Sequence, residues 1–268
     1  MEVKKGVKHR LWIYGGFITL TVGGYFYQPV RIDFLAKPPP NPNPAVDPDS
    51  KGLFSKNATV MVVTAHPDDA EYYLGAFLPK LDKAGAHIDL LVCTDGDKGF
   101  YPWENVAANR VLRRSEQLAA ARVWHAANVY FLGFPDGRLH PNPDVVEAIG
   151  GWIDRWKPGW LITYDAEYPP KVSHGDHRSA GQAAALAAKT HPVPWLMMFA
   201  THAPNDTVDV SDFIDEQKKL LALHASQFSG KKLDDVANSV AADAMDQGQR
   251  IAVDYGVDFR CARPYPEK

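Results

Sequence analysis

The feature that most constrains the fold of this chain is an alternation of short apolar runs with longer segments of helical pattern. The apolar runs cover residues 59–65, 88–94, 129–134, 160–164 and 195–200. The helical patterns cover residues 70–83, 106–123, 143–156 and 177–189, with further stretches after Ser211 and Leu233. Such alternation is typical of a mostly parallel sheet that is covered by helices on both faces. We therefore expect an α/β fold with three layers.

The amino-terminal part of the chain has a different character. Residues 1–10 carry four basic side chains and one carboxylate, and residues 11–30 contain no charged side chain. An apolar stretch behind basic residues is typical of a helix that anchors a protein in a membrane, with the basic end in the cytoplasm. A cleaved signal peptide is the alternative, although residues 11–30 lack a clear Ala-x-Ala cleavage site. We expect an uncleaved anchor and a main domain on the extracytoplasmic side, in the periplasm, a lumen or the exterior.

A proline-rich stretch separates the predicted anchor from the rest of the chain. It contains the sequence KPPPNPNPAVDPD at residues 37–49, and proline favours an extended, stiff backbone. The sequence thus predicts a basic cytoplasmic segment at 1–10, a transmembrane helix at 11–30, a linker at 31–54 and a folded domain at 55–268.

Charge and cysteine content exclude several classes of function. Lys and Arg total 29 against 32 Asp and Glu, which gives a formal net charge of −3. This balance does not favour a phosphate backbone as a partner, so we expect no nucleic acid. Cys93 and Cys261 lack the spacing of a zinc knuckle or a redox pair, and whether they form a disulfide stays open, as does the oligomeric state.

Two polar clusters follow two of the predicted strands. The first is AHPDDAE at residues 65–71, and the second is SHGDH at residues 173–177. Ligands of open parallel sheets bind beyond the carboxyl ends of the strands, so both clusters are expected to border one crevice. The alternative is structural, because each cluster also lies where a helix is expected to begin and carboxylates commonly cap helices.

The two clusters together offer the ligands of a catalytic metal. A catalytic zinc site takes three protein ligands and leaves one position for water, and His66, Asp69 and His177 satisfy that count. Three further groups remain beside such a metal for proton transfer and charge stabilisation, namely Asp68, His174 and Asp176. Two histidines and one carboxylate also bind Fe²⁺, as in iron oxygenases, but those enzymes are usually built on all-β barrels.

Four more motifs follow in order: TDGDKG at 94–99, RRSEQLAAA at 113–121, FPDGRL at 134–139 and LLALHASQF at 220–228. With the two clusters, they make the chain resemble the LmbE-like or PIG-L type N-acetylglucosaminyl deacetylases, over residues 58–263. The resemblance implies a Rossmann-like fold and a zinc-dependent hydrolase. Such an enzyme removes the N-acetyl group from an N-acetylglucosamine-type substrate and releases acetate.

The resemblance also implies which residues of the two clusters bind the metal and which one acts as the base. It makes His66, Asp69 and His177 the ligands of Zn²⁺, with Fe²⁺ as the alternative metal. It makes Asp68 the general base that takes a proton from the zinc-activated water.

Further roles follow from the other motifs in the same way. The resemblance implies that His174 stabilises the oxyanion and protonates the leaving amine, with Asp176 holding the His174 ring. It implies that Arg113 and Asp136 contact the substrate. His224, by contrast, is expected to be a core histidine without a chemical role.

The substrate is less well defined than the reaction. Tyr72 and Tyr73 stand where the family often carries small residues, which adds bulk near the site. The expected partner is an N-acetylated amino sugar or a glycoconjugate, and the sequence leaves open which one. A non-catalytic amino-sugar-binding protein is the alternative outside the enzymes.

Overall fold

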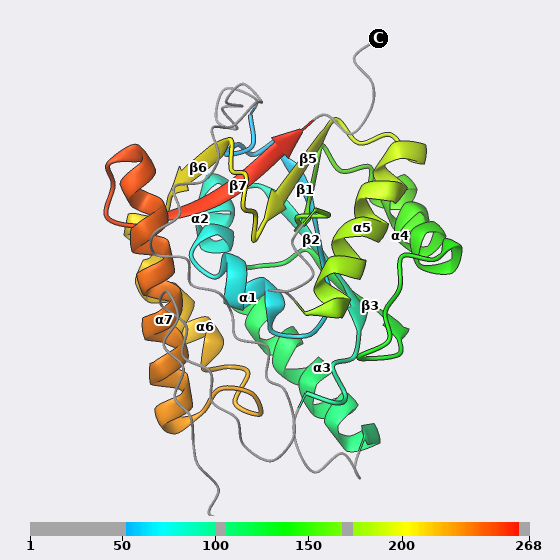
Figure 1. Cartoon of the computed structure of the whole chain (residues 1–268), viewed down its shortest axis with the longest axis horizontal. Coiled ribbons are helices and arrows are strands. Elements are labelled where there is room, and N and C mark those ends of the chain that lie inside the picture. Colours follow the sequence, from blue (N-terminus) through cyan, green and yellow to red (C-terminus); the bar gives the residue numbers. More distant parts are fainter. Residues whose placement is uncertain (1–51, 100–105, 168–173, 263–268) are drawn as a thin grey trace, which may run out of the picture.

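A computed structural model describes residues 52–99, 106–167 and 174–262 of the chain (Figure 1). In these residues, seven strands form one sheet in the order β3-β2-β1-β4-β5-β7-β6. The strands are β1 (Thr59–Thr64), β2 (His87–Thr94), β3 (Asn128–Phe134), β4 (Trp160–Tyr164), β5 (Trp195–Phe199), β6 (Asp206–Asp209) and β7 (Gly256–Ala262). The fold is a three-layer α/β fold with a mostly parallel sheet, as the sequence predicts.

Each apolar run of the sequence is a strand, and its ends differ from the predicted ones by at most one residue. The strands β1 to β5 pair in parallel, with Val60 of β1 opposite both Ile88 and Trp160. Their order, β3-β2-β1-β4-β5, is that of the doubly wound nucleotide-binding folds. The apolar side chains of β1, β2, β4 and β5 are almost all buried because helices cover both faces of the sheet, whereas those of the edge strand β3 are partly exposed.

Two strands at one edge of the sheet were not predicted. β7 pairs antiparallel with β5 on one side and with β6 on the other. Its side chains alternate between buried ones such as Phe259 and partly exposed ones such as Arg260. Charged residues inside so short a strand leave no continuous apolar run, so the pattern that revealed the parallel strands does not apply here.

The helices are α1 (Asp69–Leu74), α2 (Phe77–Ala84), α3 (Val106–Val123), α4 (Pro143–Trp156), α5 (Gly175–Thr190), α6 (Ile214–Leu221) and α7 (Gly230–Gly248). The single helix predicted at 70–83 is two helices, which are separated at Gly75. A Cβ atom on Gly75 would lie 2.7 Å from Cγ of Gln217 in α6. The absence of a side chain at Gly75 therefore lets α6 approach α1 closely.

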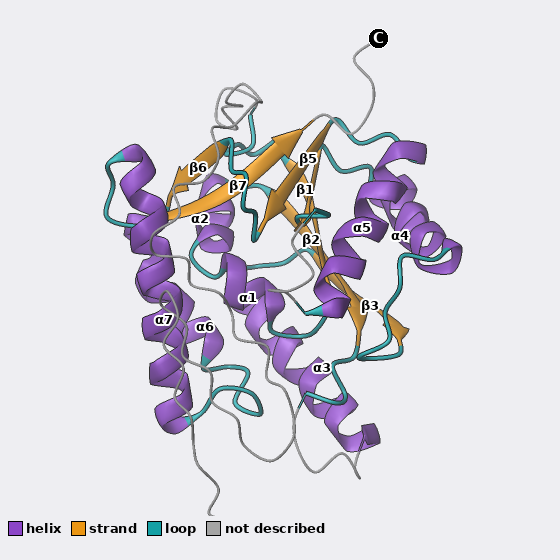
Figure 2. Cartoon of the chain, viewed as in Figure 1, coloured by secondary structure: helices purple, strands orange, loops and turns teal. Residues whose placement is uncertain are grey.

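The helices form layers on the two faces of the sheet. Figure 2 shows α4 and α5 together on one side and α1, α2 and α6 on the other. Between these layers, Val62, Leu90 and Leu161 at the centre of the sheet are completely buried. α5 packs directly on β1 and β4, which places its first residues beside the end of β1.

The structure describes only part of the chain, which bears on the predicted membrane anchor. In its described ranges, no helix combines the length and the apolar character that a membrane crossing requires. The predicted anchor at 11–30 lies outside those ranges.

Cys93 in β2 and Cys261 in β7 are both buried free thiols, so the two cysteines do not form a disulfide.

Candidate active site

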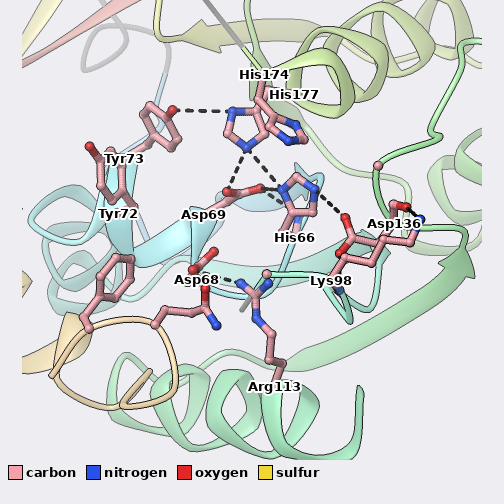
Figure 3. Close-up of a pocket in the computed structure, with 14 residues that line it drawn as sticks. His66, Asp68, Asp69, Tyr72, Tyr73, Lys98, Arg113, Asp136, His174 and His177 are labelled. Atoms are coloured by element: carbon pink, nitrogen blue, oxygen red, sulfur yellow. Dashed lines mark hydrogen bonds and ion pairs between the residues drawn. The ribbon is translucent and has the colours of Figure 1, made fainter. Parts of the chain in front are cut away.

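A cavity of about 320 Å³ lies at the carboxyl ends of the parallel strands. It is bordered by the loops after β1, β2 and β3 and by the start of α5 (Figure 3). Among the residues that line it are His66, Asp68, Asp69, Arg113, Asp136, His174 and His177. This is the crevice where the strand order reverses, between β1 and β4, and doubly wound folds bind ligands at such points.

The three predicted metal ligands face one another. His66 Nδ1 lies 3.2 Å from His177 Nε2, and Asp69 Oδ1 lies 3.2 Å from the same His177 atom. His66 Nδ1 and Asp69 Oδ2 are 3.5 Å apart. A tetrahedral ion with bonds of about 2.0–2.2 Å separates its ligand atoms by about 3.3–3.6 Å. The spacing of His66 Nδ1 from His177 Nε2 is close to this range, and the two histidines face different oxygens of Asp69, Oδ2 for His66 and Oδ1 for His177.

The turn between β1 and α1 fixes the carboxylate of Asp69. Asp69 Oδ2 accepts hydrogen bonds from the backbone N–H groups of Ala65 at 3.1 Å and His66 at 2.7 Å. Burial alone would raise the pKa of Asp69, but the neighbouring His177 and His66 hold this pKa well below its usual value. Asp69 is therefore an oriented carboxylate anion.

His66 has carboxylates at its second ring nitrogen. Its Nε2 atom lies 3.2 Å from Asp136 Oδ1 and 3.3 Å from Asp176 Oδ2. Burial would lower the pKa of His66, but Asp69, Asp136 and Asp176 together raise it well above its usual value. A carboxylate that accepts the Nε2 proton leaves Nδ1 as a metal donor, which is a common arrangement around histidine ligands.

Asp176 differs from the expected arrangement. The resemblance implies that its carboxylate holds the ring of His174, but the structure directs that carboxylate to His66. Two backbone N–H groups fix it there, from Gly137 at 2.6 Å and Leu139 at 3.1 Å. Only the backbone N–H of Asp176 reaches His174, at 3.2 Å from Nδ1.

Asp68 lies beside the metal ligands in an unusual backbone conformation. It precedes α1 with φ 101°, in the left-handed region that non-glycine residues rarely adopt. Its carboxylate Oδ2 lies 2.9 Å from a guanidinium nitrogen of Arg113. Burial raises the pKa of Asp68 and Arg113 opposes this effect. A carboxylate with a raised pKa beside an open cavity is suited to accept a proton.

Arg113 is occupied by the polypeptide itself. Its guanidinium donates to the carbonyl oxygens of Gly96, at 2.7 Å, and of Pro67, in addition to its ion pair with Asp68. Its side chain is only 4% exposed. In this structure Arg113 joins the loops after β1 and β2, and the predicted contact with a substrate stays a prediction.

His174 is the most exposed member of the site. It caps the amino end of α5, and its ring centroid lies 5.0 Å from that of His66. The ligand atoms of His66, His174 and His177 all lie within 4.8 Å of one another. Burial and the two other histidines lower the pKa of His174. A neutral imidazole at the mouth of the cavity can meet a bound molecule directly.

Aromatic residues form one wall of the site; the sequence placed Tyr72 and Tyr73 near it but did not assign Tyr164 or Phe228 to it. Tyr164 stacks on His177 with ring centroids 4.5 Å apart, and Tyr73 Oη lies 3.5 Å from His177 Nδ1. Tyr72 and Phe228 continue the wall along the cavity. The only available signal was position, since Tyr164 ends a predicted strand and Tyr73 follows the first cluster.

Comparisons with known proteins agree with this geometry. Residues 61–188 match the family model described as PIG-L, GlcNAc-PI de-N-acetylase. The matched segment contains both polar clusters of the site, so it includes all three predicted metal ligands.

Individual relatives and solved structures extend over more of the chain. The chain is 28% identical to the diacetylchitobiose deacetylase of Thermococcus kodakarensis over 193 residues, which are 65% of this chain and 72% of that protein. It is also 28% identical over 188 residues to a probable N-acetyl-α-D-glucosaminyl L-malate deacetylase of Bacillus cereus, covering 63% of this chain and 83% of that protein. The structure of N,N′-diacetylchitobiose deacetylase from Pyrococcus horikoshii superposes with a TM-score of 0.73 at 25% identity, over 78% of this chain and 85% of that one.

Proposed function

We propose that this chain is a metal-dependent deacetylase of N-acetylglucosamine-type substrates. Its residues 61–188 form a domain of the PIG-L/LmbE family. The observation that carries this proposal is the arrangement of His66, Asp69 and His177. Their closest contacts are 3.2–3.5 Å, with one oxygen of Asp69 facing each histidine, and Asp68 lies beside them in the same cavity. This is a ligand set with an adjacent base, as the hydrolysis of an amide requires.

The ligand set supports zinc as the metal, and Fe²⁺ is the alternative that the same donors accept. When bound, such an ion supplies a Lewis acid that acidifies water and polarises the acetyl carbonyl. His66 presents Nδ1 because Asp136 and Asp176 accept the proton of Nε2. Asp69 supplies the anionic ligand.

Asp68 takes the proton of the attacking water. Its carboxylate is held by Arg113 at 2.9 Å, so it keeps one direction while it gains and loses a proton. The protonated Asp68 is then a source of the proton that the departing amine requires. His174 at the mouth of the cavity is the second group for this step, in its protonated form, which gives up its proton readily because the pKa of His174 is lowered. As an imidazole N–H donor it also stabilises the negative charge that develops on the acetyl oxygen.

The relatives support an amino sugar as the substrate, since the names of several refer to acetylated glucosamine compounds. A cavity of about 320 Å³ is at the small end of ligand pockets, which begin at about 300 Å³. Tyr72 and Phe228 offer flat apolar surfaces on which a sugar ring can pack. The substrate class is therefore an N-acetylated amino sugar or a conjugate that presents one at its end.

Acetate release tests the proposal. The full chain is stripped with a chelator, reloaded with Zn²⁺ or Fe²⁺, and incubated with N-acetylglucosamine, diacetylchitobiose and a GlcNAc-inositol. We expect acetate from at least one of them with the reloaded protein and none with the stripped protein. Binding of these sugars without any acetate release, despite bound metal, would instead favour a non-catalytic amino-sugar-binding protein.

A further inference from the structure

A buried ion pair lies behind the cavity wall. His224, in the loop after α6, and Glu71, in α1, are both completely buried. His224 Nε2 lies 3.0 Å from Glu71 Oε2. A buried carboxylate is costly unless it is paired, so the histidine determines whether Glu71 can stay in this position.

The contacts continue from Glu71 toward the cavity. Glu71 Oε1 accepts hydrogen bonds from Gln117 Nε2 and Trp124 Nε1, each at 2.8 Å. Gln117 is also completely buried, and its Oε1 accepts the backbone N–H of Asp68 at 2.9 Å. A backbone N–H only donates and a carboxylate only accepts, so these two partners fix the orientation of the Gln117 amide. His224 is thereby connected to Asp68 through two intervening side chains.

The backbone of Asp68 depends on such a connection. Its φ of 101° is strained for a residue with a side chain, and strained conformations persist only where the surroundings stabilise them. Arg113 holds the carboxylate of Asp68, whereas Gln117 holds its backbone N–H. Both contacts are needed to fix the direction of the carboxylate.

We propose that His224 is a positioning residue, which acts through Glu71 and Gln117 to hold the Asp68 loop in its reactive conformation. This inference rests on the proposed function, in which Asp68 is the general base. Only one ring nitrogen of His224 takes part, because Nδ1 is buried and has no hydrogen-bond partner among the described residues. His224 thus has a role in the reaction although it lies outside the cavity lining.

The two ring nitrogens of His224 give a matched pair of variants. The amide nitrogen of a glutamine takes the place of Nε2, and that of an asparagine takes the place of Nδ1. We expect His224→Asn and His224→Leu to lower kcat for acetate release by about 10-fold to 100-fold, because a small displacement of a reacting group has effects of this size. His224→Gln keeps a donor for Glu71 and is expected to stay within about threefold of the wild-type kcat.

The kcat and KM values separate positioning from a damaged substrate pocket. The loop that contains His224 also carries Phe228, which lines the cavity. A change in the wall would raise KM, whereas a misplaced base lowers kcat. We expect KM and the bound metal content to stay near wild-type values in all three variants. Glu116→Gln is the control, because Glu116 bonds to Ser226 in the loop of His224 without contacting Glu71, so this variant shows what loosening that loop alone does to kcat.

Hydrogen exchange gives a readout that does not depend on activity. We expect faster amide exchange at Asp68 in His224→Asn than in His224→Gln, Glu116→Gln or the wild type. The inference is overturned if the Asn and Gln variants have the same kcat and the same exchange. If His224→Leu does not fold, the comparison of His224→Asn with His224→Gln still tests the inference. If the wild type itself releases no acetate, the proposed function fails, and the exchange comparison alone decides whether His224 holds the loop.

Discussion

His66 uses its two ring nitrogens for different purposes. Nδ1 faces Asp69 and His177, and Nε2 faces the carboxylates of Asp136 and Asp176. A neutral imidazole carries one proton, and the carboxylates favour its place on Nε2. The orientation of the His66 ring therefore depends on the carboxylates of Asp136 and Asp176.

Removing the charge of Asp176 is predicted to weaken metal binding. In Asp176→Asn the side chain keeps its volume but becomes a weaker acceptor for the Nε2 proton of His66. We expect the affinity for Zn²⁺ to fall by about 10-fold to 100-fold, as measured by competition with a chelator. Asp89→Asn is the matched control, because Asp89 is a buried carboxylate in β2 that pairs with Asn128. Equal affinities in both variants would refute this role of Asp176.

The sequence predicted which site residues occur together but not all of their contacts. The proximity of His66, Asp69 and His177 could be predicted because each belongs to a cluster at a strand end. The partner of Asp176 could not, because it depends on the backbone N–H groups of Gly137 and Leu139, which come from a different loop. The pairing of His224 with Glu71 joins residues 153 positions apart, and no local pattern predicts such a contact.

At the scale of elements, α5 must pack closely on β4 to place His177. A Cβ atom on Gly181 of α5 would lie 2.5 Å from the carbonyl oxygen of Tyr164. Since this oxygen belongs to the backbone of the sheet, the helix itself would have to move. Gly181 is therefore required for the close packing of α5 on β4, and His177 lies in the first turn of α5.

Gly181→Ala is predicted to destabilise the protein by about 1–3 kcal/mol, the usual cost of overpacking. The measurements are the free energy of unfolding in denaturant and the Zn²⁺ affinity, which we expect to fall together. Gly151→Ala in α4 is the matched control, because a Cβ atom there meets nothing within 4 Å. The control is expected to be neutral or to gain up to about 1 kcal/mol in helix propensity. Similar behaviour of the two variants would contradict this account of α5.

The helix α7 carries a carboxylate that opposes folding at neutral pH. Burial, together with the nearby Asp246, raises the pKa of Asp243 from 3.8 to about 6. The folded chain therefore binds this proton more tightly than the unfolded chain. The stability should increase as the pH falls from above 6 toward 4, and the penalty is present in full at pH 7.

Asp243→Asn is accordingly predicted to increase the free energy of unfolding at pH 7 by about 1 kcal/mol, with part of the effect screened by solvent. The gain should shrink as the pH falls toward 4 and disappear well below the unfolded-state pKa of 3.8, where the wild-type carboxyl is protonated in both states. Asp235→Asn, at an exposed position of the same helix, is the control and should change little. A gain that is independent of pH would show that the charge of Asp243 is not its cause.

The elements themselves were predicted where their burial follows a simple rule. Parallel strands covered by helices read as apolar runs, and all five of them, including the partly exposed edge strand β3, were found. β6 and β7 lie at the edge of the sheet, where Asp258 and Arg260 interrupt the apolar pattern. The division of the helix at Gly75 depends on the approach of Gln217 from α6, which is a tertiary contact.

At the scale of the whole molecule, we propose that residues 11–30 anchor the domain on the extracytoplasmic side of a membrane. The proposal rests on the uncharged stretch behind basic residues and on the proline-rich linker up to residue 54. We expect the full chain to stay in the membrane fraction after a carbonate wash. A reporter fused to the carboxyl end should be active only outside the cytoplasm. Activity of a cytoplasmic reporter would contradict this topology.

The central claim is that Asp68 and a metal held by His66, Asp69 and His177 remove an acetyl group. The most direct measurement compares acetate release by the metal-loaded wild type and Asp68→Asn, with bound metal determined for both. Asp97→Asn is the control, since Asp97 pairs with Arg110 outside the cavity. We predict that Asp68→Asn keeps its metal and loses about 10²-fold to 10⁴-fold in rate, while the control is unaffected. Acetate release by Asp68→Asn at the wild-type rate would contradict the account.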